Sequence, residues 1–198
     1  MSVQLILASQ SPRRVELLSQ VGVTFTQQPA DVDETPLPNE APLTYVMRMA
    51  KIKAETVWNQ ARSLESNQNL VVLGSDTIGE MNGQVLIKPT DIEDFKRTLQ
   101  MMSGDIHLIH TAIAVCTSNG VLTEVVTTEV EFGVITEQDM QWYWDSGEPQ
   151  DKAGGYAIQG LAAQFVKQIR GSYSAVVGLP LYETLNMLKQ AGITIHER

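Results

Sequence analysis

Apolar residues occur along this chain in short runs separated by polar stretches, and their spacing alternates between that of strands and that of helices. Leu5-Ile6-Leu7-Ala8 and Leu70-Val71-Val72-Leu73 are continuous apolar runs of four residues, typical of strands buried on both faces. Runs or alternation of the same kind predict further strands over 23–28, 106–117, 121–134, 165–169 and 174–177.

A helix is predicted directly after the first apolar run. Ser11 is a favourable N-cap residue, Pro12 suits the first helical position, and Gly22 is a plausible stop. The apolar stripe of this helix consists of Val15, Leu18 and Val21. The first strand therefore leads, within a few residues, into the N-terminus of a helix.

A longer helix is predicted from Leu43, after a polar, proline-rich surface loop over 29–42 and before a polar connector over 63–69. Its apolar face consists of Leu43, Val46, Met47, Ala50, Ala54, Val57, Trp58 and Ala61. Lys51 and Lys53 fall on opposite edges of that face, and spacing does not decide which of them turns toward a site. Shorter helices are predicted over 91–102, 136–146 and 180–190.

Asn82-Gly83 is a strong two-residue hairpin signal between strand-like residues. The register it implies pairs 81 with 84 and 80 with 85, and its continuation sets Thr77 opposite Lys88. Asp76 then lies within one residue of the lysine's position. Strands alternating with helices, together with such hairpins, predict an α/β fold. We expect a single domain over 1–198 with a mixed, twisted central sheet flanked by helices.

Composition narrows the possible functions. The chain has 198 residues, 43% of them hydrophobic, and a formal net charge of −9, which disfavours binding to nucleic acid. Cys116 is the sole cysteine, so an internal disulfide and a cysteine-rich zinc site are excluded, and a buried, inert thiol is expected. No apolar run is long enough to span a membrane and the N-terminus does not resemble a signal peptide, so a cytoplasmic protein is expected.

Cationic and hydroxyl side chains gather where the first strand meets its helix. Backbone N–H groups at a helix N-terminus attract anions, and Ser9, Ser11, Arg13 and Arg14 add donors suited to phosphate oxygens. The same residues would also suit an ordinary strand-turn-helix with solvated arginines. The glycine-rich segment 147–160 also allows two interpretations: it could let the backbone approach a ligand closely, or it could be a flexible connector. His107 and His110 are expected to be structural, and Trp142, Tyr143 and Trp144 to be packing groups.

Several short motifs occur in the order found in one known family. They are Ser9-Gln10-Ser11-Pro12-Arg13-Arg14, Gly74-Ser75-Asp76-Thr77, Lys88-Pro89, Ser103-Gly104 with His107, Ala153-Gly154-Gly155-Tyr156-Ala157-Ile158-Gln159-Gly160, Gly171-Ser172-Tyr173-Ser174 and Gly178-Leu179-Pro180-Leu181. Across nearly its whole length the chain resembles the Maf family of nucleoside triphosphate pyrophosphatases. It departs from the family pattern at Ile78-Gly79-Glu80 and at Ala112. The segment Tyr156-Ala157-Ile158-Gln159-Gly160 resembles the branch of this family that acts on dTTP and UTP, whereas the branch associated with 7-methyl-GTP has glutamate in place of Gln159.

The resemblance implies hydrolysis of the α–β phosphoanhydride with a divalent cation (Mg²⁺ or Mn²⁺), a nucleotide cleft at the strand ends, and a cytoplasmic homodimer. It implies Asp76 as the proton acceptor and Arg13, Thr77 and Gln159 as residues that set substrate choice. Glu34, Lys53 and Lys88 match further polar positions. Chemically, Lys53, Lys88, Arg13 and Arg14 could neutralise a triphosphate, and Asp76 could accept a proton or hold a metal with Glu34.

The hydrogen-bonding groups of the bases explain why a glutamine at position 159 would favour uracil and thymine. Its amide offers one acceptor and a pair of donors, which match the N3–H and carbonyl of uracil or thymine. Guanine presents two donors, which a carboxylate meets better. Two alternatives remain open: a 7-methyl-GTP pyrophosphatase, and a nucleotide-binding regulator of septum formation that needs no catalysis.

Overall fold

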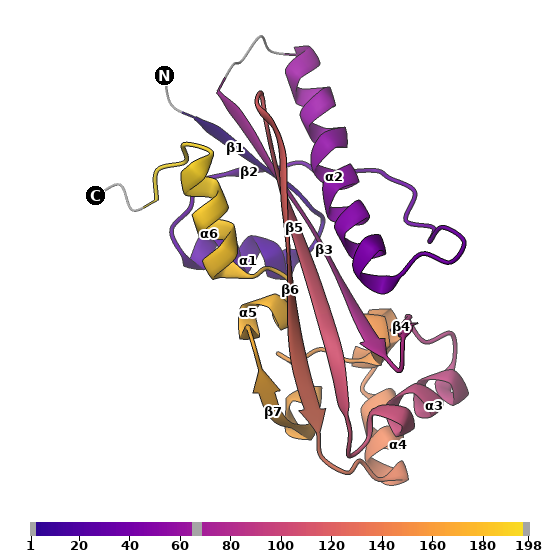
Figure 1. The fold of residues 1–198 in the computed structure, drawn as a ribbon. Helices are drawn as coiled ribbons and strands as arrows, with labels where there is room; N and C mark the ends of the chain where they lie inside the picture. The colour runs from indigo at the N-terminus through magenta and orange to yellow at the C-terminus, as the bar shows by residue number, and fades with distance from the viewer. Residues whose placement is uncertain (1–2, 65–68, 196–198) are drawn as a thin grey trace. The chain divides into compact units, whose positions relative to one another are not determined.

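A computed structural model describes residues 3–64 and 69–195 (Figure 1). The strands are β1 (Gln4–Ala8), β2 (Thr26–Gln27), β3 (Leu70–Met81), β4 (Gln84–Leu86), β5 (Ile106–Thr117), β6 (Gly120–Phe132) and β7 (Val166–Arg170). The α-helices are α1 (Pro12–Gln20), α2 (Pro42–Leu64), α3 (Ile92–Met102), α4 (Glu137–Asp145), α5 (Tyr173–Val177) and α6 (Leu181–Gln190). Three short 3-10 helices complete the set: η1 (Glu148–Asp151), η2 (Ala153–Gly155) and η3 (Leu161–Phe165).

Backbone hydrogen bonds join the strands in the order β2-β1-β3-β5-β6-β7, with β4 paired to β3. The pairs β1–β2 and β1–β3 are parallel, whereas β3–β4 and β6–β7 are antiparallel. This mixed sheet with flanking helices confirms the predicted α/β fold class. Among the described residues no helix is long and apolar enough to cross a bilayer.

The chain divides into two compact units, each built from separate segments. Unit 1 comprises 1–77, 111–126 and 178–198, and unit 2 comprises 78–110 and 127–177. Strands β3, β5 and β6 each contribute residues to both units. The prediction of a single domain over 1–198 stays a prediction.

In unit 1, the crossovers around β1 place helices on both faces of the sheet. The connection β1-α1-β2 runs to one side of β1 and β2-α2-β3 returns to the other, and right-handed crossovers in opposite directions put their helices on opposite faces. Figure 1 agrees, with α2 on one side of β1 and β3 and α1 on the other. Gly74 lets α2 approach β3, because a Cβ there would lie 2.3 Å from the Ala50 carbonyl oxygen.

In unit 2, the hairpin at Asn82-Gly83 has the predicted register, with Met81 paired to Gln84 and Glu80 to Val85. Both turn residues have the positive φ that this turn requires (53° and 78°). The predicted continuation of the ladder to Thr77 and Lys88 is wrong, because β4 ends at Leu86. Ile87 and Lys88 therefore lie outside the strand and do not pair with β3.

Three other predictions differ from the structure. The segment 174–177, predicted as a strand, lies in helix α5. Its β-branched valines favour a strand, but Ser172 stabilises the start of a helix instead. The Ser172 hydroxyl accepts a hydrogen bond from the Ala175 N–H (3.2 Å), and the Ser172 carbonyl oxygen accepts one from the Val176 N–H. The strand over 23–28 is reduced to β2. The buried side of α1 consists of Arg14, Leu17 and Leu18 rather than the stripe through Val15 and Val21. Part of the connector predicted over 63–69 lies outside the described residues.

Candidate functional site

The central feature of unit 1 is a lysine between two carboxylates. Lys53 Nζ lies 2.7 Å from Asp76 Oδ1 and 2.7 Å from Glu34 Oε1. The Lys53 and Asp76 side chains are 11% and 12% exposed, whereas Glu34 comes from the surface loop before α2 and is 58% exposed. Lys51, on the other edge of α2, is exposed and pairs with Glu55. The structure thus selects Lys53 from the two lysines that the sequence left open.

Strand β3 directs successive side chains to opposite faces, and this alternation divides the polar residues into two groups. Asp76 shares its face with Gly74 and meets Lys53 of α2. Ser75 and Thr77 point the other way: the Ser75 hydroxyl donates to the Gly178 carbonyl oxygen (3.2 Å), and Thr77 Oγ1 accepts from Arg14 of α1 (3.1 Å).

Arg14 connects the residues on the α1 side of β3 through three hydrogen bonds. Its Nε donates to the Gly178 carbonyl oxygen (2.8 Å), Nη1 to Ser9 Oγ (3.2 Å) and Nη2 to Thr77 Oγ1 (3.1 Å). Burial lowers the pKa of this guanidinium, and the nearby Asp76 carboxylate opposes that effect. Since three of its five N–H groups are already donated, Arg14 acts first as a structural link between β1, α1 and β3.

The hydroxyls of this group keep a proton to donate. Ser9 Oγ accepts from Arg14 and from the Ser11 N–H (3.1 Å), and Thr77 Oγ1 accepts from Arg14 and from the Thr111 hydroxyl (3.0 Å). Ser11 occupies the predicted N-cap position of α1, but its side chain makes no capping hydrogen bond. Within the described part of the chain Arg13 forms no hydrogen bond or ion pair. Three hydroxyls, those of Ser9, Ser11 and Thr77, and the guanidinium of Arg13 thus lie near the first turn of α1.

These groups lie where an open α/β sheet commonly binds ligands. The last pair of the β1–β3 ladder is Ala8 with Gly74, so Asp76 and Thr77 extend past the carboxyl end of β1. The crossovers on the two sides of β1 leave in opposite directions, and such switch points are the usual position of ligands in this architecture.

In unit 2, the predicted residues Lys88 and Gln159 are both exposed. Their segments are connected, because the Gly154 N–H donates to the carbonyl oxygen of Ile87 (3.0 Å), next to Lys88. Gly155 has no room for a side chain, since a Cβ would lie 2.8 Å from the Phe95 ring. The glycine-rich segment is therefore tied down along its length by hydrogen bonds and 3-10 turns, rather than forming a simple connector.

His107, His110 and Cys116 are structural, as predicted. His107 is buried, contacts Phe132 and Tyr156 edge-on, and has a pKa lowered by burial to about 4. His110 lies 2.8 Å from both Thr127 Oγ1 and Glu80 Oε2. Burial raises the pKa of the Cys116 thiol to about 11, so a reactive thiolate is absent at neutral pH.

The predicted aromatic packing holds in the interior of unit 2. Tyr143 is fully buried, and the rings of Phe95 and Trp144 lie 5.2 Å apart, whereas Trp142 is about half exposed and contributes less.

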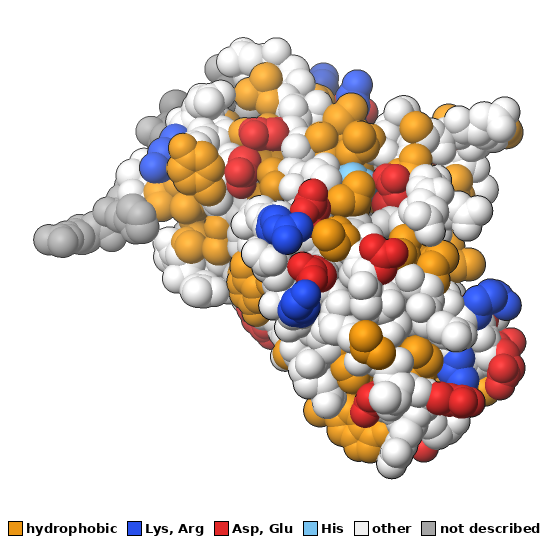
Figure 2. Space-filling model, turned by 60° about the horizontal axis from the view of Figure 1, so that its bottom comes forward, with side chains coloured by type: hydrophobic (Ala, Val, Ile, Leu, Met, Phe, Trp, Pro, Cys, Tyr) orange, Lys and Arg blue, Asp and Glu red, His pale blue; other side chains and the backbone are white. Residues whose placement is uncertain are grey.

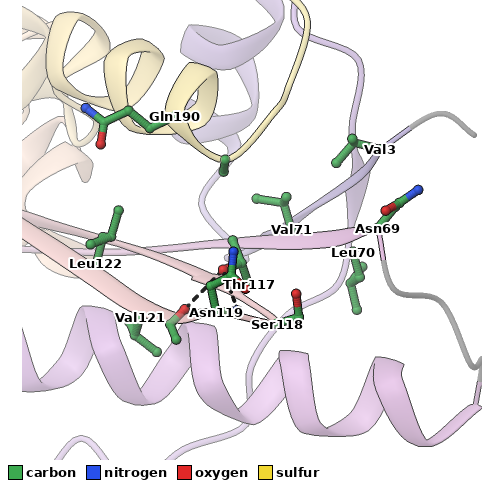
Figure 3. A pocket seen from close by; sticks show the side chains of 12 residues that line it. Val3, Asn69, Leu70, Val71, Thr117, Ser118, Asn119, Val121, Leu122 and Gln190 are labelled. Carbon is green, nitrogen blue, oxygen red and sulfur yellow. Dashed lines mark hydrogen bonds between the residues drawn. The ribbon is translucent and has the colours of Figure 1, made fainter.

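A pocket of about 380 Å³ in unit 1 is a poor match for a phosphate ligand (Figure 3). It is lined by the start of β3, the β5–β6 turn and the end of α6, and Figure 3 shows Asn69, Leu70, Asn119 and Gln190 around it. None of its lining residues is cationic. It also lies at the Leu70 end of β3, about 20 Å along the strand from Asp76 at ~3.3 Å per residue.

The predicted metal ligands, Glu34 and Asp76, fit Mg²⁺ or Mn²⁺ only as a partial site. The described residues contain no group of three or more His, Cys, Asp or Glu side chains placed to hold a metal. Two carboxylates around one lysine do suit Mg²⁺, which usually takes one or two carboxylates and completes its shell with water and substrate phosphates. The donor set is thus compatible with a cation that arrives with a nucleotide.

Sequence reasoning missed several partners of these residues. Gly178 is 164 positions from Arg14, and Thr111 is 34 positions from Thr77, so no local pattern connects them. The glycine at 74 was a usable signal, because a glycine inside a buried apolar strand often marks close approach of another backbone.

Comparison with known proteins places these features in a family. The profile described as Maf-like protein matches residues 4–191. A dTTP/UTP pyrophosphatase of Pseudoalteromonas atlantica is 49% identical over 193 residues, which cover 98% of this chain and 99% of that protein. A dTTP/UTP pyrophosphatase of Colwellia psychrerythraea is 51% identical, covering 100% and 93%. One of Shigella sonnei is 48% identical, covering 93% and 91%. The chain therefore belongs to the Maf family.

Proposed function

We propose that this protein hydrolyses the α–β phosphoanhydride of dTTP and UTP, releasing the nucleoside monophosphate and pyrophosphate. The observation that carries the proposal is the nearly full-length similarity to proteins named dTTP/UTP pyrophosphatase. The Glu34–Lys53–Asp76 cluster, where β3 extends past the carboxyl end of β1, supports it, since the reaction needs a carboxylate and cations around a triphosphate.

Each residue has a proposed task. Water attacks the α-phosphorus, Asp76 accepts the water's proton or helps to hold a divalent cation, and pyrophosphate leaves with the bridging oxygen. Lys53 and Lys88 offset the charge on the phosphoryl oxygens. Arg13, Ser9, Ser11 and Thr77 donate to phosphate oxygens together with the α1 N-terminus, while Arg14 holds Ser9 and Thr77 in place. Gln159 selects the base.

A divalent cation, Mg²⁺ or Mn²⁺, is part of the proposal. Glu34 and Asp76 would hold it, and it would neutralise charge on the phosphates. The protein is further proposed to act as a homodimer on a free nucleotide, which light scattering of the purified protein would test.

A substrate panel tests the proposal directly. The purified protein is incubated with Mg²⁺ and, separately, dTTP, UTP, CTP, GTP and 7-methyl-GTP, and the products are identified by chromatography. We expect dTMP or UMP with pyrophosphate from the first two substrates. Preference for 7-methyl-GTP would replace this function with the sister activity. Binding of dTTP without any product would favour a nucleotide-binding regulator.

A further inference from the structure

The segment that carries Gln159 forms a tight, anchored turn in unit 2. The Gly160 N–H donates to the Ala157 carbonyl oxygen (3.0 Å), which closes a turn over 157–160. Ala157 and Ile158 are buried, whereas the next residue, Gln159, is exposed. The direction of the Gln159 side chain therefore depends on what holds the two ends of this turn.

Two side chains hold those ends. The Ala157 N–H donates to the Tyr143 hydroxyl oxygen (3.3 Å), and that hydroxyl donates to Glu148 Oε1 (2.7 Å). The other carboxylate oxygen, Oε2, accepts from the Leu161 N–H (2.9 Å). One chain of hydrogen bonds thus begins just before Gln159 and ends just after it. We call Tyr143 and Glu148 together the clamp.

The missing side chain of Gly160 makes room for the clamp. A Cβ at this position would lie 2.2 Å and 2.4 Å from the two carboxylate oxygens of Glu148. Any other residue would push the carboxylate out of the space it occupies. A glycine one position after Gln159 is therefore a requirement of the clamp, and φ at Gly160 (−106°) shows that its backbone conformation needs no glycine.

The clamp itself is fixed by packing. Tyr143 is fully buried, and its ring lies 5.9 Å from the tilted Phe95 ring and 5.6 Å from the Phe165 ring, which it meets edge-on. Burial and the Glu148 carboxylate both raise the pKa of the Tyr143 phenol, so it stays protonated and can donate at every working pH. A second anchor precedes the turn, where the Tyr156 hydroxyl lies 2.7 Å from His107 Nε2.

The geometry points to Tyr143 and Glu148 as positioning residues for base selection: they hold the turn over 157–160 so that Gln159 can present its amide to a pyrimidine. This inference rests on the proposed function, because Gln159 has a base to recognise only if the substrate is a nucleotide. Neither clamp residue is among those proposed to contact the phosphates or to take part in the hydrolysis. Loss of the clamp should therefore change which base is accepted more than it changes turnover.

The test combines variants with two independent measurements. Tyr143→Phe removes the hydroxyl and keeps the ring, Glu148→Ala removes both acceptors, and Glu148→Gln keeps an acceptor for Leu161 and a polar contact to Tyr143. Matched controls are Tyr182→Phe and Glu124→Gln, two exposed positions outside unit 2. Amide hydrogen exchange at Ala157 and Leu161 reports the turn without any substrate, and kcat and KM for dTTP, UTP and CTP report base selection.

We expect exchange at Ala157 to accelerate at least about tenfold in Tyr143→Phe, and exchange at Leu161 to do so in Glu148→Ala, because each loses a hydrogen-bond acceptor. The preference for dTTP over CTP, as the ratio of kcat/KM, should fall about tenfold, mainly through KM for dTTP. Glu148→Gln should recover most of both effects, and the controls should match the parent protein. If Tyr143 and Glu148 only stabilised the fold, kcat/KM for dTTP, UTP and CTP would fall by the same factor.

Two results would overturn the inference: unchanged exchange in both variants, or faster exchange with an unchanged base preference. If Tyr143→Phe does not fold, Gly160→Ala provides the second route, because it displaces the Glu148 carboxylate and leaves Tyr143 intact. If the parent protein hydrolyses neither dTTP nor UTP, the proposed function falls, and the exchange measurement still decides whether the clamp holds the turn.

Discussion

The Lys53 ammonium lies between two carboxylates, and its burial makes each of them matter. Asp76 is almost as buried as Lys53, whereas Glu34 is more than half exposed. Burying a charge is costly unless it is paired, so the Lys53–Asp76 contact is needed simply to keep both groups inside the protein. The exposed Glu34 side chain can exchange partners at much smaller cost when a polyanion or a cation arrives.

Replacing Asp76 with Asn should leave the fold intact and remove the carboxylate from the proposed chemistry. We expect pyrophosphate release from dTTP to slow by roughly 10²–10⁴-fold, the usual contribution of a positioned general base. Lys53 keeps Glu34 as a partner but loses its buried counter-charge, so the melting temperature should fall while the protein still folds. Asp145→Asn, an exposed position that retains its acceptor for Gln141, is the matched control. A rate within tenfold of the parent would remove Asp76 from this role.

Replacing Gln159 with Glu should change the preferred base. A carboxylate has no donor for a pyrimidine carbonyl, but it can accept from the two donors on the edge of guanine. We expect lower kcat/KM for dTTP and UTP and higher kcat/KM for guanine nucleotides. Steady-state kinetics on the nucleotide panel measure this, and an unaltered order of substrates would contradict the proposed role.

His107 should make the protein less stable as the pH falls from 6.5 toward 4. Burial lowers its folded-state pKa to about 4, below the ordinary value of 6.5, so in this window the unfolded chain binds a proton that the folded protein does not. The free energy of unfolding should then fall by up to about 3 kcal/mol across the window. Urea unfolding of the parent and of His107→Gln at several pH values measures this. Parallel pH curves for the two proteins would refute it.

At the scale of the element, β3 organises both groups of polar residues in unit 1. Alternation along one strand sends Asp76 toward α2 and Thr77 toward α1, and each helix then supplies the partner, Lys53 or Arg14. Gly74 sets how closely α2 approaches this strand. The position of Lys53 relative to Asp76 therefore depends on a residue that carries no side chain.

Gly74→Ala should be strongly destabilising. Its Cβ would lie 2.3 Å from the Ala50 carbonyl oxygen and 2.8 Å from the Ala54 nitrogen, and backbone cannot yield as a side chain can. We expect a loss of about 3 kcal/mol or more, the upper part of the range for overpacking. Thermal or urea unfolding measures it.

Gly133→Ala is the control for this change. Its nearest neighbour would be 3.8 Å from the new Cβ, and its φ is not positive. Equal stability losses in the two variants would show that the close approach of α2 is not the cause.

Across the whole molecule, charge favours a small anionic ligand over a polymeric one. The chain has 14 Lys and Arg against 23 Asp and Glu. On the face shown in Figure 2, basic side chains are interspersed with acidic ones rather than gathered in one broad area. Ion pairs such as Lys167–Glu131 and Arg170–Glu129 further reduce the charge available to a long phosphate backbone.

The protein is therefore expected not to bind duplex DNA. At about 10 μM protein, a nonspecific binder with Kd near 10⁻⁶ M would hold most of a trace labelled duplex in complex. An unchanged mobility of the duplex would therefore exclude binding of that strength. The measurement is made at low and at physiological salt, because binding through phosphates would weaken steeply as salt rises. A salt-sensitive shift would show a basic surface that the net charge conceals.

Features that depend on a few neighbouring residues follow from the sequence alone. Asn82-Gly83 set the hairpin register through the positive φ of both residues, and the helix predicted over 136–146 begins as expected, where Thr136 and Asp139 form a capping box at the start of α4. The alternation of strands and helices determined the α/β class. Local signals failed where two of them competed, as in α5, where a serine cap outweighed valines that favour a strand.

Which side chains meet depends instead on how the helices and strands pack. Lys51 and Lys53 are equivalent by helical spacing, and the approach of α2 to Gly74 buries one and leaves the other exposed. Arg14, predicted beside a phosphate, is instead committed to Gly178, which is 164 positions away. The clamp on Gln159 likewise needs a tyrosine from α4 and a glutamate from η1. Hydrogen bonds between distant residues follow from packing, which no local pattern of apolar and polar positions contains.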